Sequence, residues 1–247
     1  MENKHLLQIR SSFSSLITII RKIREQKGRE DESITKVNDL ISYTGGVYID
    51  LHFEKALTYQ HLYMNTGKGE YLKKMHDSVM SAGYMIKKID NNQWLSRYFR
   101  FLGRISDYSN QFPKSILYYK KAIKCVELDP DYRNDVPRDL ELKGFLSYAL
   151  IMSGSFARGQ KIASDLIKVY QSSEVGLGLK RKDFDTWIIW FSGHVIRTVE
   201  AFIKRKVVFD VEIAKSWINI VDLEFSKKPK EYLYRKKELK DLLRSLN

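Results

Sequence analysis

Three arginines stand in a row on one face of a segment that begins at Trp94. Arg97, Arg100 and Arg104 are three and four residues apart, and this spacing places them on the same side of an α-helix. A guanidinium group is planar and can donate two parallel hydrogen bonds to a carboxylate or a phosphate. The row therefore predicts a surface for an anionic group. The alternatives are a solvated row and a row paired within the chain.

Basic runs near the C-terminus form a second candidate. Residues 180–247 contain 16 lysines and arginines against 10 acidic residues, in a chain whose net charge is +13. Such charge is typical of solvated faces, and also of a surface that meets nucleic acid, an acidic protein segment or a membrane. The aromatic residues mostly fall on predicted core stripes, which weakens the nucleic-acid hypothesis. The candidate basic patch comprises Lys204, Arg205, Lys206, Arg235, Lys236 and Lys237.

Patterns for catalysis, metals or cofactors do not stand out in the sequence. The 5 histidines include no helical metal-binding pair such as HExxH. Gly67-Lys68-Gly69 lacks the spacing of a phosphate-binding loop, and Ser153-Gly154-Ser155 is read as a helix turn. The single cysteine, Cys125, lies beside an apolar face and excludes an internal disulfide. We therefore predict a protein that is not an enzyme and uses no cofactor or metal.

The elements that carry the arginines are predicted to be antiparallel pairs of helices. From Trp94, apolar residues recur at three-and-four spacing until a break at residues 109–111, and a second stripe then runs to Asp129-Pro130. The next pair turns at residues 153–155. One pair cannot bury its own apolar face, so neighbouring pairs must stack. The repeating anchor positions are Phe99, Leu102, Gly103, Phe112, Ser115, Tyr119 and Ala122 in the first pair, and Leu146, Ser147, Leu150, Phe156, Gly159, Ala163 and Leu166 in the second.

This template resembles the tetratricopeptide repeat, and the likeness is clearest over residues 94–170. The resemblance implies a right-handed α-solenoid in which the first helix of each pair lines a concave groove. Some members of the family hold a peptide's terminal carboxylate with a lysine and an asparagine there. Arg100 and Arg104 occupy the matching places here, and Gly144 and Tyr148 occupy those of the next pair, so that specific clamp is not reproduced.

A looser groove for an acidic peptide is what the resemblance implies instead. The predicted peptide-binding residues are Arg97, Arg100, Arg104 and Tyr148. Replacing Arg100 and Arg104 together with alanine is then expected to leave helicity intact and to weaken partner capture.

The chain as a whole is predicted to be all-α and a single domain over residues 1–247. Hydrophobic residues make up 43% and prolines number only 4, which suits a helical core. About five hairpins are expected, with a C-terminal capping helix over residues 230–246. The serine- and glycine-rich residues 171–179 are predicted to be a loop, and the best place for a hinge.

Two stretches bear on localisation. The apolar helix over residues 184–203 is interrupted by Asp185, His194, Arg197 and Glu200, which favours burial in a soluble protein over membrane insertion. The segment from Leu6 to Ile20 is predicted to be the first solenoid helix, with a targeting presequence as the alternative. We therefore expect a cytoplasmic protein.

The predicted function is a helical-repeat scaffold or adaptor that binds a protein or peptide, an acidic one above all. The alternative is a nucleic-acid or nucleoprotein-associated factor that uses the basic C-terminal region. A third hypothesis makes the chain a subunit of a larger complex, docked through the helix around Trp187 and Trp190, against burial of that helix in its own fold. Partner identity, pathway and oligomeric state are left open by the sequence.

Overall fold

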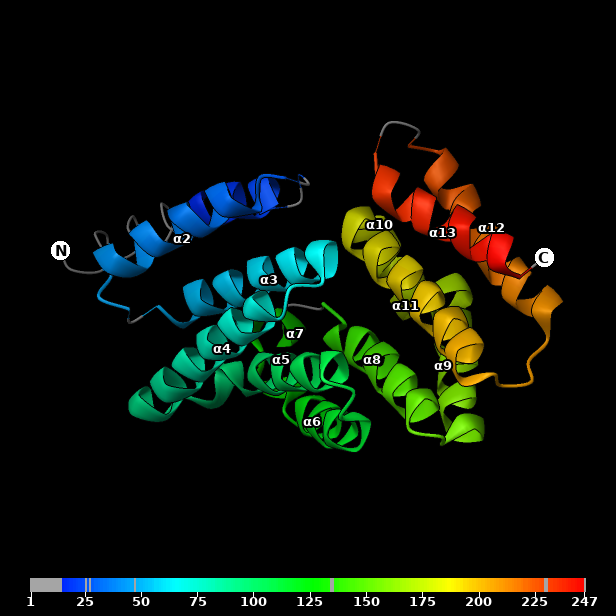
Figure 1. The fold of residues 1–247 in the computed structure, drawn as a ribbon, viewed down its shortest axis with the longest axis horizontal. Coiled ribbons are helices and arrows are strands. Elements are labelled where there is room, and N and C mark those ends of the chain that lie inside the picture. The colour runs from blue at the N-terminus through cyan, green and yellow to red at the C-terminus, as the bar shows by residue number, and fades with distance from the viewer. Residues whose placement is uncertain are drawn as a thin grey trace.

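The helices form a succession of antiparallel pairs from the N-terminal to the C-terminal end of the molecule (Figure 1). Within the described residues of this computed structural model all regular structure is helical and no strand is present, which agrees with the predicted all-α class. The structure describes residues 15–24, 26, 28–46, 48–133, 136–228 and 231–246.

Residues 15–24 are helical and precede the labelled elements. The α-helices that follow are α2 Glu30–Tyr43, α3 Ile49–Thr66, α4 Gly69–Ile89, α5 Leu95–Tyr108, α6 Phe112–Lys124, α7 Pro130–Arg133, α8 Arg138–Met152, α9 Phe156–Ser172, α10 Glu174–Lys182, α11 Phe184–Arg205, α12 Val211–Ser226 and α13 Leu233–Ser245. Two short 3-10 helices are η1 Asn92–Trp94 and η2 Val126–Leu128.

Turns between paired helices fall where the sequence predicts them. Gly67, with φ 69°, ends α3, and Gly154, with φ 93°, separates α8 from α9. Glycine adopts this left-handed conformation without the clash that a Cβ atom would cause. Asn110, with φ 56°, makes the same excursion between α5 and α6. The predicted turns at residues 109–111 and 153–155 are confirmed.

Small residues let the paired helices approach closely, as the anchor template predicts. A Cβ atom on Gly103 of α5 would lie 2.4 Å from a ring carbon of Tyr119 on α6. A Cβ atom on Gly159 of α9 would lie 2.6 Å from the side chain of Ile151 on α8. Both distances are far below van der Waals contact, so a larger residue at either position would force the two helices apart.

The apolar interior follows the order of the helix pairs. One cluster around Phe53 and Met75 lies among α3, α4 and α5, and the largest surrounds Trp187 where α11 meets α9, α12 and α13. Smaller clusters on α6 and α8 lie between them, and flanking side chains such as Phe99 and Ile162 each contact two clusters. The core is therefore connected from α3 to α13.

The prediction of a loop over residues 171–179 is wrong. These residues continue the end of α9 and then form most of α10, and the chain is non-helical only at Ser173. Ser173 caps α10, because its hydroxyl accepts a hydrogen bond from the backbone N–H of Gly176. A Cβ atom on Gly176 would lie 2.0 Å from the carbonyl oxygen of Val169. Glycine at 176 thus serves a close helix contact and not a flexible loop.

Both ends of the described chain pack onto their neighbours. In α13, which covers most of the predicted capping segment, Leu239 and Leu242 are buried against the cluster that contains Trp187. At the other end Ile20 and Ile23 are buried. The rest of the predicted first helix, residues 4–14, lies outside the described residues.

The tryptophans of α11 belong to the interior. Trp187 is 2% exposed and donates a hydrogen bond from its indole N–H to the carbonyl oxygen of Tyr170 at 3.2 Å. Trp190 is partly buried against the same cluster. Of the two alternatives for this helix, docking on another subunit or burial within its own fold, the structure shows the second for Trp187 and Trp190. Among the described helices, none combines the length and the apolar character needed to cross a bilayer.

Candidate functional site

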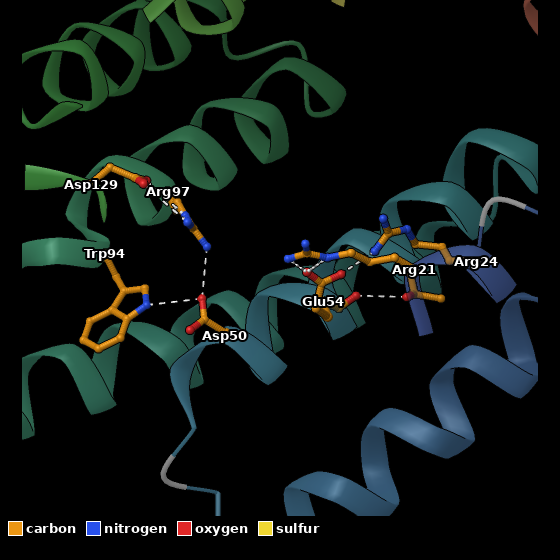
Figure 2. Close-up of polar contacts among 8 residues, drawn as sticks. Arg21, Arg24, Asp50, Glu54, Trp94, Arg97 and Asp129 are labelled. Carbon is orange, nitrogen blue, oxygen red and sulfur yellow. Dashed lines mark hydrogen bonds and ion pairs between the residues drawn. The ribbon is translucent and has the colours of Figure 1, made fainter. Parts of the chain in front are cut away.

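Arg97 is held away from the other two arginines of its row. Its Nε donates to Asp129 and its Nη1 donates to Asp50, each at 3.0 Å (Figure 2). Asp129 is completely buried, and Asp50 also accepts a hydrogen bond from the indole of Trp94 at 3.3 Å. Arg97 therefore ties α5 to α3 and to the segment that precedes α7.

A second set of ion pairs fixes the helical residues 15–24 to α3. Arg21 and Arg24 both donate to the carboxylate of Glu54, at 2.8 Å and 2.5 Å (Figure 2). Burial alone would raise the pKa of Glu54, but the two guanidinium groups outweigh burial and the pKa is lowered. Glu54 is therefore ionised at neutral pH and holds the N-terminal helix in place.

Arg100 forms a two-pronged pair with Glu141 of α8. Its Nε and Nη2 donate to the two carboxylate oxygens at 3.1 Å and 2.6 Å. Glu141 is 7% exposed, and burial would raise its pKa, yet the charge and hydrogen bonds of Arg100, with the charges of Arg138 and Arg197, together outweigh burial and lower the pKa. This fork geometry is the strongest arrangement open to an arginine and a carboxylate.

Arg104 is paired within its own helix. Its Nη1 lies 3.3 Å from the carboxylate of Asp107, and its Nη2 donates to the hydroxyl of Tyr108. The hydroxyl of Tyr119 donates to the same Asp107 oxygen. Burial would lower the pKa of Arg104, but these neighbours raise it, so the guanidinium keeps its charge.

One aromatic ring gathers these arginines with another from α11. The guanidinium carbons of Arg100, Arg104 and Arg197 lie 5.3, 4.7 and 4.4 Å from the ring centroid of Phe145. The electron-rich face of an aromatic ring attracts such cations. Tyr119 stacks on the same ring at 5.5 Å. We name the group the Phe145 cluster; it consists of Arg100, Arg104, Asp107, Glu141, Phe145 and Arg197.

Arg197 differs from its two neighbours in the Phe145 cluster. It has neither a hydrogen bond nor an ion pair with any described residue, and its Nε is buried without a partner. Its pKa is lowered to about 10, first because of burial and then because Arg104 and Arg235 repel its charge, while Glu141 opposes the change. Arg197 as a whole is half-buried.

Two glycines make room for the guanidinium of Arg197. A Cβ atom on Gly193 would lie 2.9 Å from Nη1, and one on Gly144 would lie 3.8 Å from Nη2. Gly144 is also a position at which the resemblance to the tetratricopeptide repeat, drawn from the sequence, implied a ligand-binding side chain. The absence of a side chain at 144 instead opens α8 to Arg197 and His194.

Tyr148, the fourth predicted peptide-binding residue, borders this cluster. Its ring meets Phe112 edge to face at 6.3 Å, and its hydroxyl has no hydrogen bond to the described part of the chain. Burial and the nearby charge of Asp107 raise its pKa to about 12, while Arg104 and Arg197 act in the opposite sense. The hydroxyl is therefore protonated at neutral pH and can donate a hydrogen bond.

His194 lies beside Arg197 but is buried and neutral. Its Nε2 donates to the carbonyl oxygen of Ala163 at 3.0 Å, because a carbonyl oxygen can only accept. Burial lowers its pKa to about 4. His194 thus adds no charge to the site at neutral pH. Among the described residues no group of three or more histidine, cysteine or acidic side chains is placed to hold a metal ion.

The basic residues predicted as one patch lie toward opposite ends of α11. Lys204, Arg205 and Lys206 are at its C-terminal end. Lys228 and Tyr232, just before α13, contact Asp185 in the first turn of α11, so the start of α13 lies near the other end. Across its 22 residues α11 rises about 33 Å. Arg235 pairs with Glu238, and the Lys236 ammonium donates to the Lys228 carbonyl oxygen.

No protein-family model matches the sequence, and no curated protein matches it either.

Site residues that the sequence did not indicate are Arg197, Glu141 and Asp107. The structure brings Arg100 and Arg104 together with Tyr148 near Phe145, and it places Arg97 elsewhere. The pairing within the chain, raised as an alternative from the sequence, is the arrangement found for all three arginines of the row. A double alanine variant at 100 and 104 would leave buried Glu141 and Asp107 without these partners, so its helicity is no longer expected to stay intact.

Proposed function

We propose that this chain is a non-catalytic scaffold that binds an acidic segment of a protein partner on the face formed by α5, α8 and α11. The observation that carries the proposal is the charge of the Phe145 cluster. Three guanidinium groups stand against two carboxylates, which leaves one positive charge in excess, on Arg197. A charge held in partly buried surroundings attracts an anion more strongly than one surrounded by water.

The architecture that we propose for this scaffold is a right-handed α-solenoid of the tetratricopeptide kind. The succession of helix pairs and their connected core support it. In such a solenoid α3, α5, α8 and α11 are the first helices of their pairs and line the inner wall. Arg197 and Tyr148 then face the same groove.

An acidic protein segment fits this face better than nucleic acid. Bases bind proteins largely by stacking on accessible aromatic rings. Phe145 is 4% exposed and is covered by Tyr119 and the arginines, so it offers no platform for a base. Lys204–Lys206 and Arg235–Lys237 also lie toward different ends of α11, which counts against one continuous basic patch formed by these six residues.

Binding of a labelled oligoglutamate peptide to the full chain tests the proposal. Fluorescence anisotropy would be followed at fixed ionic strength, with an oligoglutamine peptide amidated at its C-terminus as the control without carboxylates. Labelled single-stranded and double-stranded nucleic acids would be titrated in parallel. We expect saturable binding of oligoglutamate, no binding of oligoglutamine, and weaker binding of nucleic acid.

The outcomes separate the two functional classes. Nucleic acid that binds more tightly than oligoglutamate, with affinity falling steeply as salt rises, would replace the proposed function with the alternative. Absence of oligoglutamate binding at low salt would end the proposal for an acidic partner.

A further inference from the structure

A cationic side chain that is partly buried normally has a counter-charge within reach, because removing a charge from water is costly. In the Phe145 cluster Arg100 has Glu141 and Arg104 has Asp107. Arg197 contacts the same ring and is influenced by the charge of Glu141, but no described carboxylate forms an ion pair or a hydrogen bond with it. The hydrogen-bond donors of the Arg197 guanidinium are therefore not used within the described part of the fold.

The nearest acidic side chain on α11 does not fill this role. Glu200 follows Arg197 by three residues and could reach it along the helix, yet it lies 3.6 Å from Lys204 instead. Both Glu200 and Arg197 influence the pKa of Tyr148, so the three side chains border one region. Within that region the Tyr148 hydroxyl is a second hydrogen-bond donor, and it too has no hydrogen-bond partner among the described residues.

We propose that Arg197 and Tyr148 together bind one carboxylate of the acidic segment, an inference that rests on the proposed function. The planar guanidinium donates to the carboxylate oxygens, and the Tyr148 hydroxyl donates a further hydrogen bond. Gly144 and Gly193 provide the space, since a Cβ atom at Gly193 would lie 2.9 Å from the Arg197 guanidinium. The bound carboxylate then supplies a negative charge to Arg197, as Glu141 does to Arg100 and Asp107 does to Arg104.

The test measures oligoglutamate affinity for the full chain and five variants. Arg197→Met removes the charge but keeps much of the side-chain volume, and Tyr148→Phe removes only the hydroxyl. Glu200→Gln removes the competing carboxylate of α11. Arg158→Met is the matched control, because Arg158 is exposed on α9 and its replacement makes the same change in net charge. Thermal melts followed by circular dichroism establish that each variant is folded.

We expect Arg197→Met to weaken binding about tenfold or more, and Tyr148→Phe about threefold to tenfold. Glu200→Gln should tighten binding by about twofold to fivefold, because a like charge leaves the region. Arg158→Met should stay within about twofold of the unmodified chain. Arg197→Lys, which keeps the charge and loses the fork, should fall between the unmodified chain and Arg197→Met.

Two peptides distinguish the sources of the carboxylate. An oligoglutamate with an amidated C-terminus retains only side-chain carboxylates, whereas an oligoglutamine with a free C-terminus retains only the terminal one. Whichever peptide responds to Arg197→Met identifies the group bound.

Failure of the inference and failure of the proposed function give different results. If the unmodified chain binds oligoglutamate and folded Arg197→Met binds it equally well, the assignment of Arg197 is wrong while the proposed function stands. If the unmodified chain does not bind oligoglutamate, both are overturned. If Arg158→Met weakens binding as much as Arg197→Met, the effect is one of net charge and the assignment is again wrong.

Discussion

On α5, Arg100 and Arg104 donate to the buried carboxylates of Glu141 and Asp107, whereas Arg197 on α11 approaches the same phenyl ring and donates to no carboxylate of the described chain. Arginines from α5 and from α11 thus contact the same ring, but only those of α5 are paired with a carboxylate. A buried pair is costly to break, since loss of one partner leaves an isolated charge. Replacement of Arg197 leaves no described carboxylate without its ion-pair partner. Pairing therefore distinguishes Arg100 and Arg104, which are bound to carboxylates of the fold, from Arg197, for which we propose a ligand.

The largest effect is expected at the two-pronged pair between Arg100 and buried Glu141. Arg100→Met should lower the free energy of unfolding by about 3–5 kcal/mol, because Glu141 would remain in the interior without its two-pronged partner. Urea denaturation of the full chain, followed by circular dichroism, measures the change. Arg158→Met is the control for loss of one positive charge from an exposed position, and it should change stability by less than about 0.5 kcal/mol.

Equal stability of Arg100→Met and the unmodified chain would contradict the role assigned to the pair. It would mean that Glu141 is neutral, or compensated by Arg197, in the folded variant. The comparison across Phe145 would then no longer distinguish the two helices.

Lowering the pH is expected to act through α11, beside Arg197. His194 has a folded-state pKa of about 4, against about 6.5 for an unfolded chain, so the unfolded state takes up the proton first as pH falls. The stability that neutral His194 contributes should therefore be fully present above the pKa of the unfolded chain, about 6.5. It should be lost as the pH falls from there toward the folded-state pKa of about 4. The loss is about 2 kcal/mol between about pH 7 and about pH 5.

A His194→Gln variant isolates this contribution. Glutamine can still donate to the Ala163 carbonyl oxygen but does not titrate, so its stability should change less over the same pH interval. Identical pH profiles for the two proteins would show that His194 is not the titrating group. Glu54 and Glu141, whose pKa values are lowered, lose their contributions only at lower pH.

The sequence predicted the helix pairs well because their signals are local. Apolar spacing of three and four, and turns at Gly67, Asn110 and Gly154, depend only on neighbours along the chain. The same local reasoning was wrong at residues 171–179, where serine and glycine suggested a loop. There Ser173 caps a helix and Gly176 permits a close contact with α9, and both roles depend on packing that composition does not report.

The candidate site was predicted only in part, for a related reason. Helical spacing places Arg97, Arg100 and Arg104 on one face, but Asp129 and Glu141 are 32 and 41 residues away from their partners. Which carboxylate meets which arginine is decided by how the helix pairs stack. Arg197 was visible in the sequence only as a charge that interrupts an apolar helix. An arginine in that setting, near a glycine at 193, is the one sequence signal that could have indicated it.

The smallest change in stability should come from Arg197→Met. This variant tests the difference between the two arginines directly, because the same substitution at position 100 is expected to be strongly destabilising. Removing the guanidinium forfeits its attraction to the Phe145 ring, which is of order 1 kcal/mol. It also removes the cost of holding an unpaired cation beside Arg104 and Arg235. The two effects oppose each other, so the free energy of unfolding should stay within about 1 kcal/mol of the unmodified chain. A loss as large as that of Arg100→Met in the urea experiment would show that the folded chain in solution gives Arg197 a partner, and both arginines would then be structural.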